Sequence, residues 1–343
     1  MSEGIVSRRE RVKTAIAHRQ PDKVPWDLGM GGRLHEMLVA HYGGEEKVPS
    51  LGNHFAHVPT QTPTGEPTEV EIAPGIWRDR FGVVWNKNAA SGSIGLVQEH
   101  PLKTRSLNGY EFPTAEGPKT FELYPQTIEE RREYFLVTGI GFSLFERAWT
   151  LRGMEELLVD MVEAPGFVEG LLDAITDWNL VLLRQMVTYD IDCVRLGDDW
   201  GAQRGLIMGP RLWRRFLKPR LARMFEAIHA GGKAAMVHSD GDIQAVLPDL
   251  IEIGLDIYNP LQPDVMDPYE VKRLYGDRLS FHGGVSVQQF LPFATAEEVR
   301  REVRRMLVEL GAGGGFIITP THSILEDVPV ENLAALLETV AEQ

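Results

Sequence analysis

The sequence contains one cysteine, Cys193, among its 343 residues. An intrachain disulfide is therefore excluded, as is a zinc module built from several cysteines. No stretch approaches the roughly 18 consecutive apolar residues that a membrane-spanning helix requires. Residues 1–10 are polar and charged, which is not the pattern of a secretory signal peptide. These absences predict a cytoplasmic protein with no membrane span.

Positive charge is also scarce, because 35 Lys and Arg residues stand against 49 Asp and Glu residues, a net charge of −14. General nucleic-acid binding needs clustered cations that neutralise phosphates, so this class of partner is excluded. The glycines at residues 29–32 lack the GxGxxG spacing of a dinucleotide-binding loop. No GxSxG elbow occurs, which leaves little support for Ser–His–Asp catalysis.

What the sequence does contain, from about residue 135 onward, is a regular alternation of short apolar runs and helical segments. The alternation predicts parallel strands joined by right-handed crossovers, and the apolar runs are typical of strands buried on both faces. The expected strands are residues 135–141, 191–196, 234–237, 255–258, 279–281 and 316–318. The expected helices are residues 152–162, 164–189, 210–230, 243–253, 268–275, 296–310 and 330–341.

The first third of the chain is less regular. Ser7 to His18 predicts a short helix, in which Ser7 and Glu10 have the spacing of a capping box. Residues 24–28 predict a first strand, and residues 76–85 alternate like a hairpin. Residues 50–120 carry many Pro, Gly and Thr, and we expect them to form an irregular insertion covering the barrel.

Together these patterns predict an α/β fold. About eight strands result if two lie in the first third, which favours a (β/α)8 TIM barrel over a doubly wound open sheet. Residues 1–343 are then one barrel domain with an N-terminal loop and hairpin elaboration.

Polar side chains follow the expected strands where each strand ends. The clearest stretch is Lys233-Ala-Ala-Met-Val-His-Ser-Asp-Gly-Asp242, in which an apolar run stops at His238. Comparable strand ends are Gly197-Asp-Asp-Trp200, His282-Gly-Gly284 and Thr319-Pro-Thr-His322. Sites in parallel α/β proteins form at the carboxyl ends of strands, so we expect these four ends to converge on one pocket.

The residue types at these ends favour metal or acid–base chemistry. His238 and His322 with a carboxylate, Asp240 or Glu146, can hold a catalytic zinc with an open position for substrate. Adjacent carboxylates such as Asp198 and Asp199 can hold a cation, orient a histidine or act as acid and base. The alternatives are histidines that only form hydrogen bonds in loops and an aspartate that only caps a turn. The candidate catalytic residues are Asp198, Asp199 and Asp240, and the candidate metal ligands are His238, His322 and Glu146.

Other residues are candidates for substrate contact. Trp26 and Trp200 can wall an apolar pocket, although tryptophans lie more often in the core. Arg33, beside the glycines, can meet an anion. Gln262 and His282 complete the set of candidate substrate-binding residues. Cys193 is expected to be an inert buried thiol, because apolar residues flank it.

Several of these motifs resemble the uroporphyrinogen decarboxylase superfamily, and the likeness extends over nearly the whole chain. It implies a (β/α)8 barrel. The residues that carry it are 7–25, Gly197-Asp-Asp-Trp200, His238-Ser-Asp-Gly241, 249–262, 276–284 and 313–322.

Within this superfamily, the chain looks closer to the corrinoid-dependent methyltransferase branch. True uroporphyrinogen decarboxylases carry an arginine-rich N-terminal segment, where this sequence has Gly29-Met-Gly-Gly-Arg33. The methyltransferases often bind zinc through a His-x-Cys pair and a later Cys. Here His238 matches the His, Asp240 stands where the Cys would be, and Thr321-His322 replaces the later Cys region. The resemblance therefore implies a metal held by oxygen and nitrogen, which is a harder Lewis acid.

Three functions remain open from the sequence. The first is transfer of a methyl group between a small methylated substrate, an ether, an amine or similar, and a separate corrinoid protein, with help from zinc. The second is a metal-free decarboxylase in which Asp198 steers a proton and Arg33 holds a substrate acid. The third is a non-catalytic protein that binds a small molecule or a corrinoid. Barrels of this type commonly pair, so a homodimer is one candidate assembly, although the sequence itself gives no oligomeric state.

Overall fold

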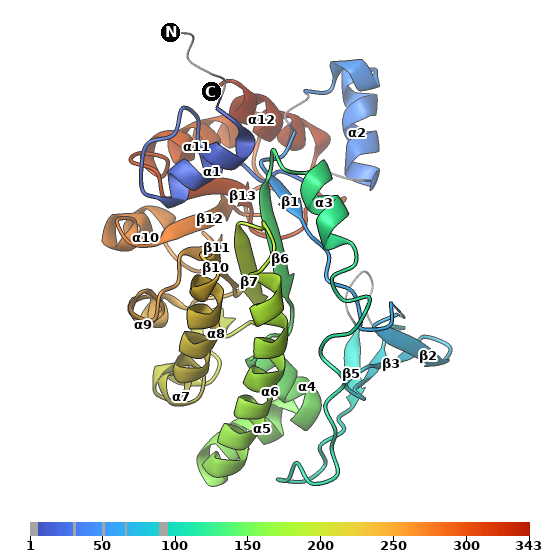
Figure 1. Ribbon diagram of the computed structural model, residues 1–343. Coiled ribbons are helices and arrows are strands. Elements are labelled where there is room, and N and C mark those ends of the chain that lie inside the picture. The colour runs from blue at the N-terminus through green and yellow to red at the C-terminus, as the bar shows by residue number, and fades with distance from the viewer. Residues whose placement is uncertain (1–5, 30–31, 50–51, 66, 89–94) are drawn as a thin grey trace.

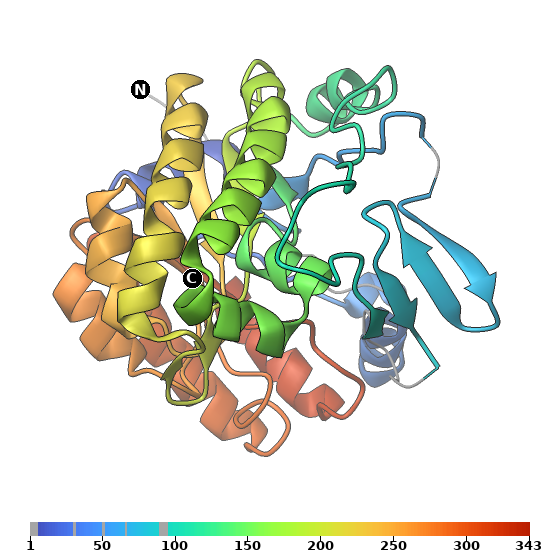
Figure 2. The same ribbon diagram turned by 90° about the horizontal axis from the view of Figure 1, so that it is seen from below.

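Seven parallel strands form one curled sheet at the centre of the protein, and helices surround it (Figures 1 and 2). The computed structural model describes residues 6–29, 32–49, 52–65, 67–88 and 95–343. The strand order is β1-β6-β7-β10-β11-β12-β13. This arrangement confirms the predicted α/β barrel. The strands are β1 (Phe55–His57), β6 (Phe135–Ile140), β7 (Cys193–Gly197), β10 (Ala234–His238), β11 (Ile257–Leu261), β12 (Ser280–Val285) and β13 (Phe316–Pro320).

A short extended segment, residues 24–28, joins the two edges of this sheet. Trp26 forms a parallel bridge with Ile318 of β13, and the N–H of Asp27 donates to the carbonyl of Ile318 at 3.0 Å. On the other side, the N–H of His54, which precedes β1, donates to the carbonyl of Trp26 at 3.2 Å. The predicted first strand therefore exists as the segment that closes the barrel.

Helix α1 (Arg8–Ile16) closes the amino-terminal end of the barrel. The Ser7 hydroxyl accepts a hydrogen bond from the N–H of Glu10 at 3.1 Å, which is one half of the predicted capping box. Val12 of this helix packs into the barrel interior against Phe135 and Cys193. The inner face of α1 thus completes the apolar core.

The remaining helices are mostly crossovers between barrel strands, and none in the described part of the chain is long and apolar enough to cross a membrane. They are α2 (Gly32–Tyr42), η1 (Glu45–Lys47), α3 (Tyr124–Glu130), α4 (Phe145–Arg152), α5 (Met154–Glu163), α6 (Pro165–Met186), α7 (Gly209–Phe216), α8 (Lys218–Ala230), η2 (Gln244–Val246), α9 (Leu247–Glu252), α10 (Pro268–Tyr275), α11 (Ala296–Glu309) and α12 (Val330–Ala341).

Some helical predictions need correction. The single helix expected over 210–230 is two helices, α7 and α8, that meet at Leu217. Pro219 explains the break, because it lacks an N–H and clashes with the preceding turn, yet it fits the first turn of α8. Helices α2 and α4 were not predicted. In the glycine-rich turn beside α2, residues 30–31 lie outside the described part.

A separate antiparallel sheet lies beside the barrel in both views (Figures 1 and 2). Its central hairpin is the one predicted over 76–85. It contacts the barrel where β6 ends, since the ring of Trp85 lies 5.9 Å from that of Phe142. The insertion expected over 50–120 must be narrowed, because β1 lies within that range and pairs with β6. The strands of this sheet are β2 (Glu69–Ala73), β3 (Ile76–Asp79), β4 (Val84–Asn86) and β5 (Leu96–Glu99), and a further pair, β8 (Gly201–Ala202) and β9 (Gly205–Leu206), follows β7.

His54 is a buried histidine that holds the closing segment, and it is 1% exposed. Its Nδ1 accepts a hydrogen bond from the N–H of Trp26 at 2.9 Å. Burial, and then the positive charge of Arg11, lowers the pKa of His54 from 6.5 to about 3. The folded protein therefore does not bind a proton that the unfolded chain accepts below about pH 6.5.

We expect the free energy of unfolding of the native protein to fall as the pH drops from about 6.5 toward 4. Over this range the unfolded chain binds a proton at His54, whereas the folded protein does not, so protonation favours unfolding. His54→Asn keeps an acceptor for Trp26 and removes the titrating ring. Its urea unfolding curves should therefore show a shallower pH dependence, by up to about 3 kcal/mol over that range. Parallel pH profiles for the two proteins would contradict this assignment.

Candidate active site

The barrel interior changes from apolar to polar along the strands. Every second residue of a strand points inward. Near the amino ends, Phe135, Cys193 and Ile257 form an apolar cluster. Cys193 is completely buried, and burial raises the pKa of its thiol well above the usual value, so it is the inert thiol that the sequence predicted. Toward the carboxyl ends, His238 and Asn259 take over the inward positions.

These carboxyl ends enclose a cavity of about 620 Å³. The strand ends that follow β7, β10 and β13 all contribute to it. Six of the residues singled out from the sequence therefore line one cavity: Glu146, Asp199, His238, Asp240, His282 and His322.

Hydrogen bonds determine which ring nitrogen of His238 faces this cavity. The side-chain amide of Asn259 lies 3.2 Å from the backbone carbonyl of His282. Because a carbonyl oxygen can only accept a hydrogen bond, the NH2 group of Asn259 must face it. The Oδ1 atom of Asn259 then faces Nδ1 of His238 at 2.6 Å and requires a proton there. In the neutral ring, Nε2 of His238 then carries no proton, and its lone pair is free to bind a ligand.

Asp199 and Asp240 approach His238 from two neighbouring strand ends. The N–H of Asp240 donates to Oδ1 of Asp199 at 2.9 Å, and Oδ1 of Asp240 lies 4.0 Å from Nε2 of His238. Glycines allow this approach. A Cβ atom on Gly201 would lie 2.4 Å from the Asp240 carbonyl oxygen, and Gly241 has a φ of +82° that favours glycine.

One ligand atom from each of Asp199, His238 and Asp240 lies within 4.8 Å of the other two. Burial and the charge of Asp199 raise the pKa of Asp240, while His238 and His322 lower it. The sequence had grouped His238 with His322 and a carboxylate, Asp240 or Glu146, and had preferred His322 and Glu146 as the metal ligands. Those two line the same cavity but fall outside the compact group of three.

Glu146 has an environment that favours its neutral form. Burial, and then the negative charges of Asp198 and Asp199, raise its pKa to about 8. This shift favours a protonated carboxyl at the cavity wall, which is able to donate a hydrogen bond.

Asp198 does not reach the cavity, although its neighbour Asp199 does. It is completely buried, and its carboxylate accepts hydrogen bonds from the N–H groups of Phe145 at 2.8 Å and Glu146 at 2.7 Å. The indole Nε1–H of Trp200 donates to the same carboxylate. Asp198 therefore caps α4 from a distant part of the chain. Burial raises its pKa to about 6, against the lowering effect of these donors.

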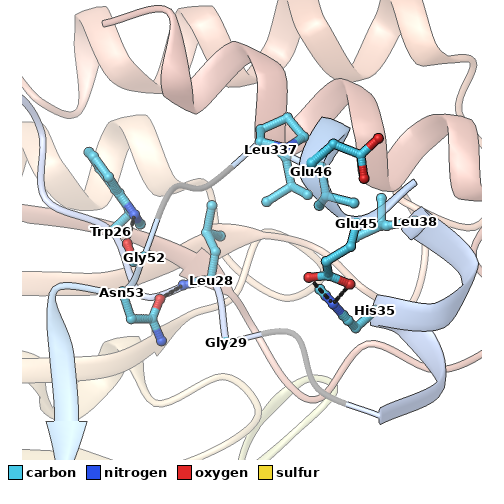
Figure 3. Close-up of a pocket in the computed structure, with 12 residues that line it drawn as sticks. Trp26, Leu28, Gly29, His35, Leu38, Glu45, Glu46, Gly52, Asn53 and Leu337 are labelled. Carbon is cyan, nitrogen blue, oxygen red and sulfur yellow. Dashed lines mark hydrogen bonds and ion pairs between the residues drawn. The ribbon is translucent and has the colours of Figure 1, made fainter. Parts of the chain in front are cut away.

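Neither tryptophan walls the cavity at the strand ends, which corrects the expectation for both. Trp200 is fully buried under Asp198. Trp26 lines a second cavity of about 530 Å³ beside α2 and α12, where Figure 3 shows it opposite the His35–Glu45 contact. The indole of Trp26 donates to the carbonyl of Gly52 at 2.8 Å. Trp26 lies there because its backbone closes the barrel beside β13, which turns its side chain away from the cavity at the strand ends.

Two further candidates for substrate contact also lie elsewhere. Arg33 is on the surface of α2, with a side chain that is 67% exposed and 3.8 Å from Glu326. Gln262 is buried and accepts the N–H of Gly241 at 3.0 Å, so it supports the turn that carries Asp240.

Sequence reasoning missed three charged or titratable groups in the cavity, which are Arg195, Asp27 and His57 at the end of β1. Arg195 of β7 points into it, and Asp27 of the closing segment lies 3.3 Å from Nε2 of His282. Arg195 had a usable signal, since a charged residue interrupts an otherwise apolar strand. Asp27 had no such signal in the sequence, because its position in the cavity depends on the closure of the barrel by residues 24–28.

A parallel barrel with polar groups gathered at the carboxyl ends of its strands is the architecture of a TIM-barrel enzyme. The chain belongs to the uroporphyrinogen decarboxylase (URO-D) family, whose family model matches residues 97–343.

Similar curated proteins are uroporphyrinogen decarboxylases. That of Syntrophotalea carbinolica is 28% identical over 186 residues, which cover 52% of this chain and 50% of the relative. That of a Thermus thermophilus strain is 27% identical over 173 residues, covering 50% and 48%. The chain thus spans about half the length of these relatives.

A similar solved structure is a methyltransferase from Methanosarcina mazei. It has a TM-score of 0.69 and 19% sequence identity, and the match covers 98% of this chain and 99% of that one. This likeness concerns the fold.

Asp198→Asn should lower the free energy of unfolding by about 2–3 kcal/mol, because the NH2 group of the amide would face buried N–H donors. Asp199→Asn is the matched control. Asp199 is half-buried and accepts the N–H of Asp240, so its loss should cost less than about 1 kcal/mol. Urea unfolding measures both, and equal losses would argue against the capping role of Asp198.

Asn259→Leu should release His238 from a single tautomer, because the acceptor for its Nδ1–H is gone. The nitrogen chemical shifts of the ring in the metal-free protein report this directly. Gln262→Leu removes a neighbouring amide that does not contact His238 and should leave the shifts unchanged. A single Nδ1–H tautomer in the Asn259→Leu protein would show that the amide does not control the ring.

Proposed function

We propose that this protein transfers a methyl group from a small methylated substrate, such as an ether or an amine, to a corrinoid held by a separate protein. The observation that carries the proposal is the lone pair of His238 Nε2, which faces two carboxylates inside the cavity. An oriented imidazole beside two acids suits metal-assisted chemistry better than simple ligand storage.

The donors fit a divalent cation such as zinc. The imidazole nitrogen of His238 and the carboxylates of Asp199 and Asp240 are all ligand types that zinc accepts. Asn259 supports His238 from behind, as metal-binding histidines are commonly supported. When bound, the metal would supply Lewis acidity toward the heteroatom that carries the methyl group.

The cavity itself suits a small substrate. Ile140, Phe142 and Ile324 offer apolar contact in its wall, whereas Glu146 and His322 offer hydrogen bonds. A corrin ring with its substituents is larger than 620 Å³, so a partner protein would present it at the open mouth. The similar structure from Methanosarcina mazei is named a methyltransferase, which supports the same reaction class.

A decarboxylase without metal is the second candidate, because the curated relatives are named uroporphyrinogen decarboxylases. It would use Arg195 to hold a substrate acid, since Arg33 lies away from the cavity. It differs from the first candidate by releasing carbon dioxide without any methyl acceptor. A non-catalytic binding protein would do neither.

The decisive experiment combines metal analysis with a methyl-transfer assay. We expect the purified protein to contain about one zinc ion and to methylate free cob(I)alamin from a panel of methoxy and methylamino compounds, as followed by absorbance. Removing zinc with a chelator should abolish the reaction. His238→Ala should lower the rate by at least about 100-fold, because several kcal/mol of charge stabilisation would be lost.

His41→Ala is the control, because His41 lies exposed on α2, outside the cavity. A metal-free protein whose methyl transfer is indifferent to the chelator and to His238→Ala would remove metal from the proposal. Carbon dioxide release without cobalamin methylation would support the decarboxylase. Tight binding of a panel member without turnover would support the binding protein.

A further inference from the structure

Arg195 carries a permanent positive charge inside the barrel. It lies in the middle of β7, in register with Met236 of β10 and Gly139 of β6. Its side chain is exposed to the cavity at the strand ends and also lines a deeper cavity of about 320 Å³. Of the described residues that line the upper cavity, Arg195 alone is an arginine or lysine.

This charge has no partner in the part of the chain that the structure describes. The two arginines of α4 are paired by contrast: Arg147 lies 3.3 Å from Asp79, and Arg152 lies 2.8 Å from Asp160. Arg195 forms no hydrogen bond and no ion pair with any described residue. A cation that faces a cavity and is neutralised by no acid keeps its charge for an anionic ligand, so a residue of this kind is typical of a binding site.

The surroundings of Arg195 leave its charge available. Asp27 is the nearby acid in the deeper cavity, but it accepts a hydrogen bond from Asn53 at 2.8 Å and lies 3.3 Å from His282. Burial and the charge of Arg195 lower the pKa of His57, which favours the neutral form of that ring beside Arg195. A Cβ atom on Gly141 would meet open space, which shows room for a ligand in the upper cavity.

The two ends of the cavity differ in charge. Arg195 pairs in register with Met236, which precedes His238 by two residues, so its backbone lies about 7 Å deeper along the strands. The carboxylates of Asp199 and Asp240 lie at the upper level with His238. An anionic end of a bound molecule is therefore favoured beside Arg195 and disfavoured beside the two carboxylates.

We propose that Arg195 binds the carboxylate of the substrate, so that the substrate class is a small methylated carboxylic acid. The planar guanidinium matches a carboxylate with two parallel hydrogen bonds. In a chain with a net charge of −14, an anion is retained only where a local cation holds it. That the substrate carries a methyl group rests on the proposed function. The anion-binding role of Arg195 does not depend on methyl transfer.

The test compares three matched pairs of ligands by calorimetry: methoxyacetate with methoxyacetamide, 4-methoxybenzoate with 4-methoxybenzamide, and N,N-dimethylglycine with its amide. We expect at least one carboxylate to bind at least about tenfold more tightly than its amide. Arg195→Gln should abolish that difference while leaving the amide affinity unchanged. Arg195→Lys should keep part of it, because the charge remains without the planar pair of donors.

Arg211→Gln is the matched control. Arg211 is exposed on α7, and its substitution changes the net charge equally, so the carboxylate preference should persist. No preference in any pair, or a preference that survives Arg195→Gln, would overturn the proposal.

The same variants separate this inference from the proposed function. A carboxylate preference that depends on Arg195, without methyl transfer to cob(I)alamin, would uphold the anion site and count against the methyltransferase. Methyl transfer from neutral substrates at the same rate in the native protein and in Arg195→Gln would uphold the methyltransferase and count against the anion site.

Discussion

The hydrogen bonds of residues 24–28 are the constraint on which the architecture depends. Without them, β13 and β1 would each present an unpaired edge, which sheets avoid. Trp26 and Asp27 satisfy the β13 side, and His54 satisfies the other. Closure brings the ends of strands from opposite parts of the chain around one cavity. It also carries Asp27 to His282 and turns the indole of Trp26 away from that cavity.

Within the cavity, His238 and the two carboxylates beside it are positioned by neighbouring residues. The carbonyl of His282 orients Asn259, which in turn orients His238. Two glycines bring the turns after β7 and β10 together, so that Asp199 and Asp240 meet. Asp198 lies one residue from Asp199 and points the opposite way, because successive residues face apart and its side is filled by the amino end of α4.

Much of the fold and part of the site could be predicted from sequence patterns. The period of the apolar residues predicted each barrel strand from β6 onward, and the polar residues at the strand ends predicted the cavity with His238 and Asp240. Helix α4 was not predicted because part of its capping comes from Asp198, far along the chain. Trp200 and Gln262 were expected in the cavity, but their polar atoms are bonded to Asp198 and Gly241. Residue type alone does not reveal such partners.

The sequence by itself determined the class of fold, the family and the set of polar residues at the strand ends, because these follow from local periodicity and from residue identity. Only the tertiary structure decided which of those residues share a cavity, which nitrogen of His238 faces it, and that Arg195 stands there unpaired. The reason is physical. Burial, hydrogen-bond partners and neighbouring charges arise between residues far apart in the chain, and they exist only once residues 24–28 have closed the barrel.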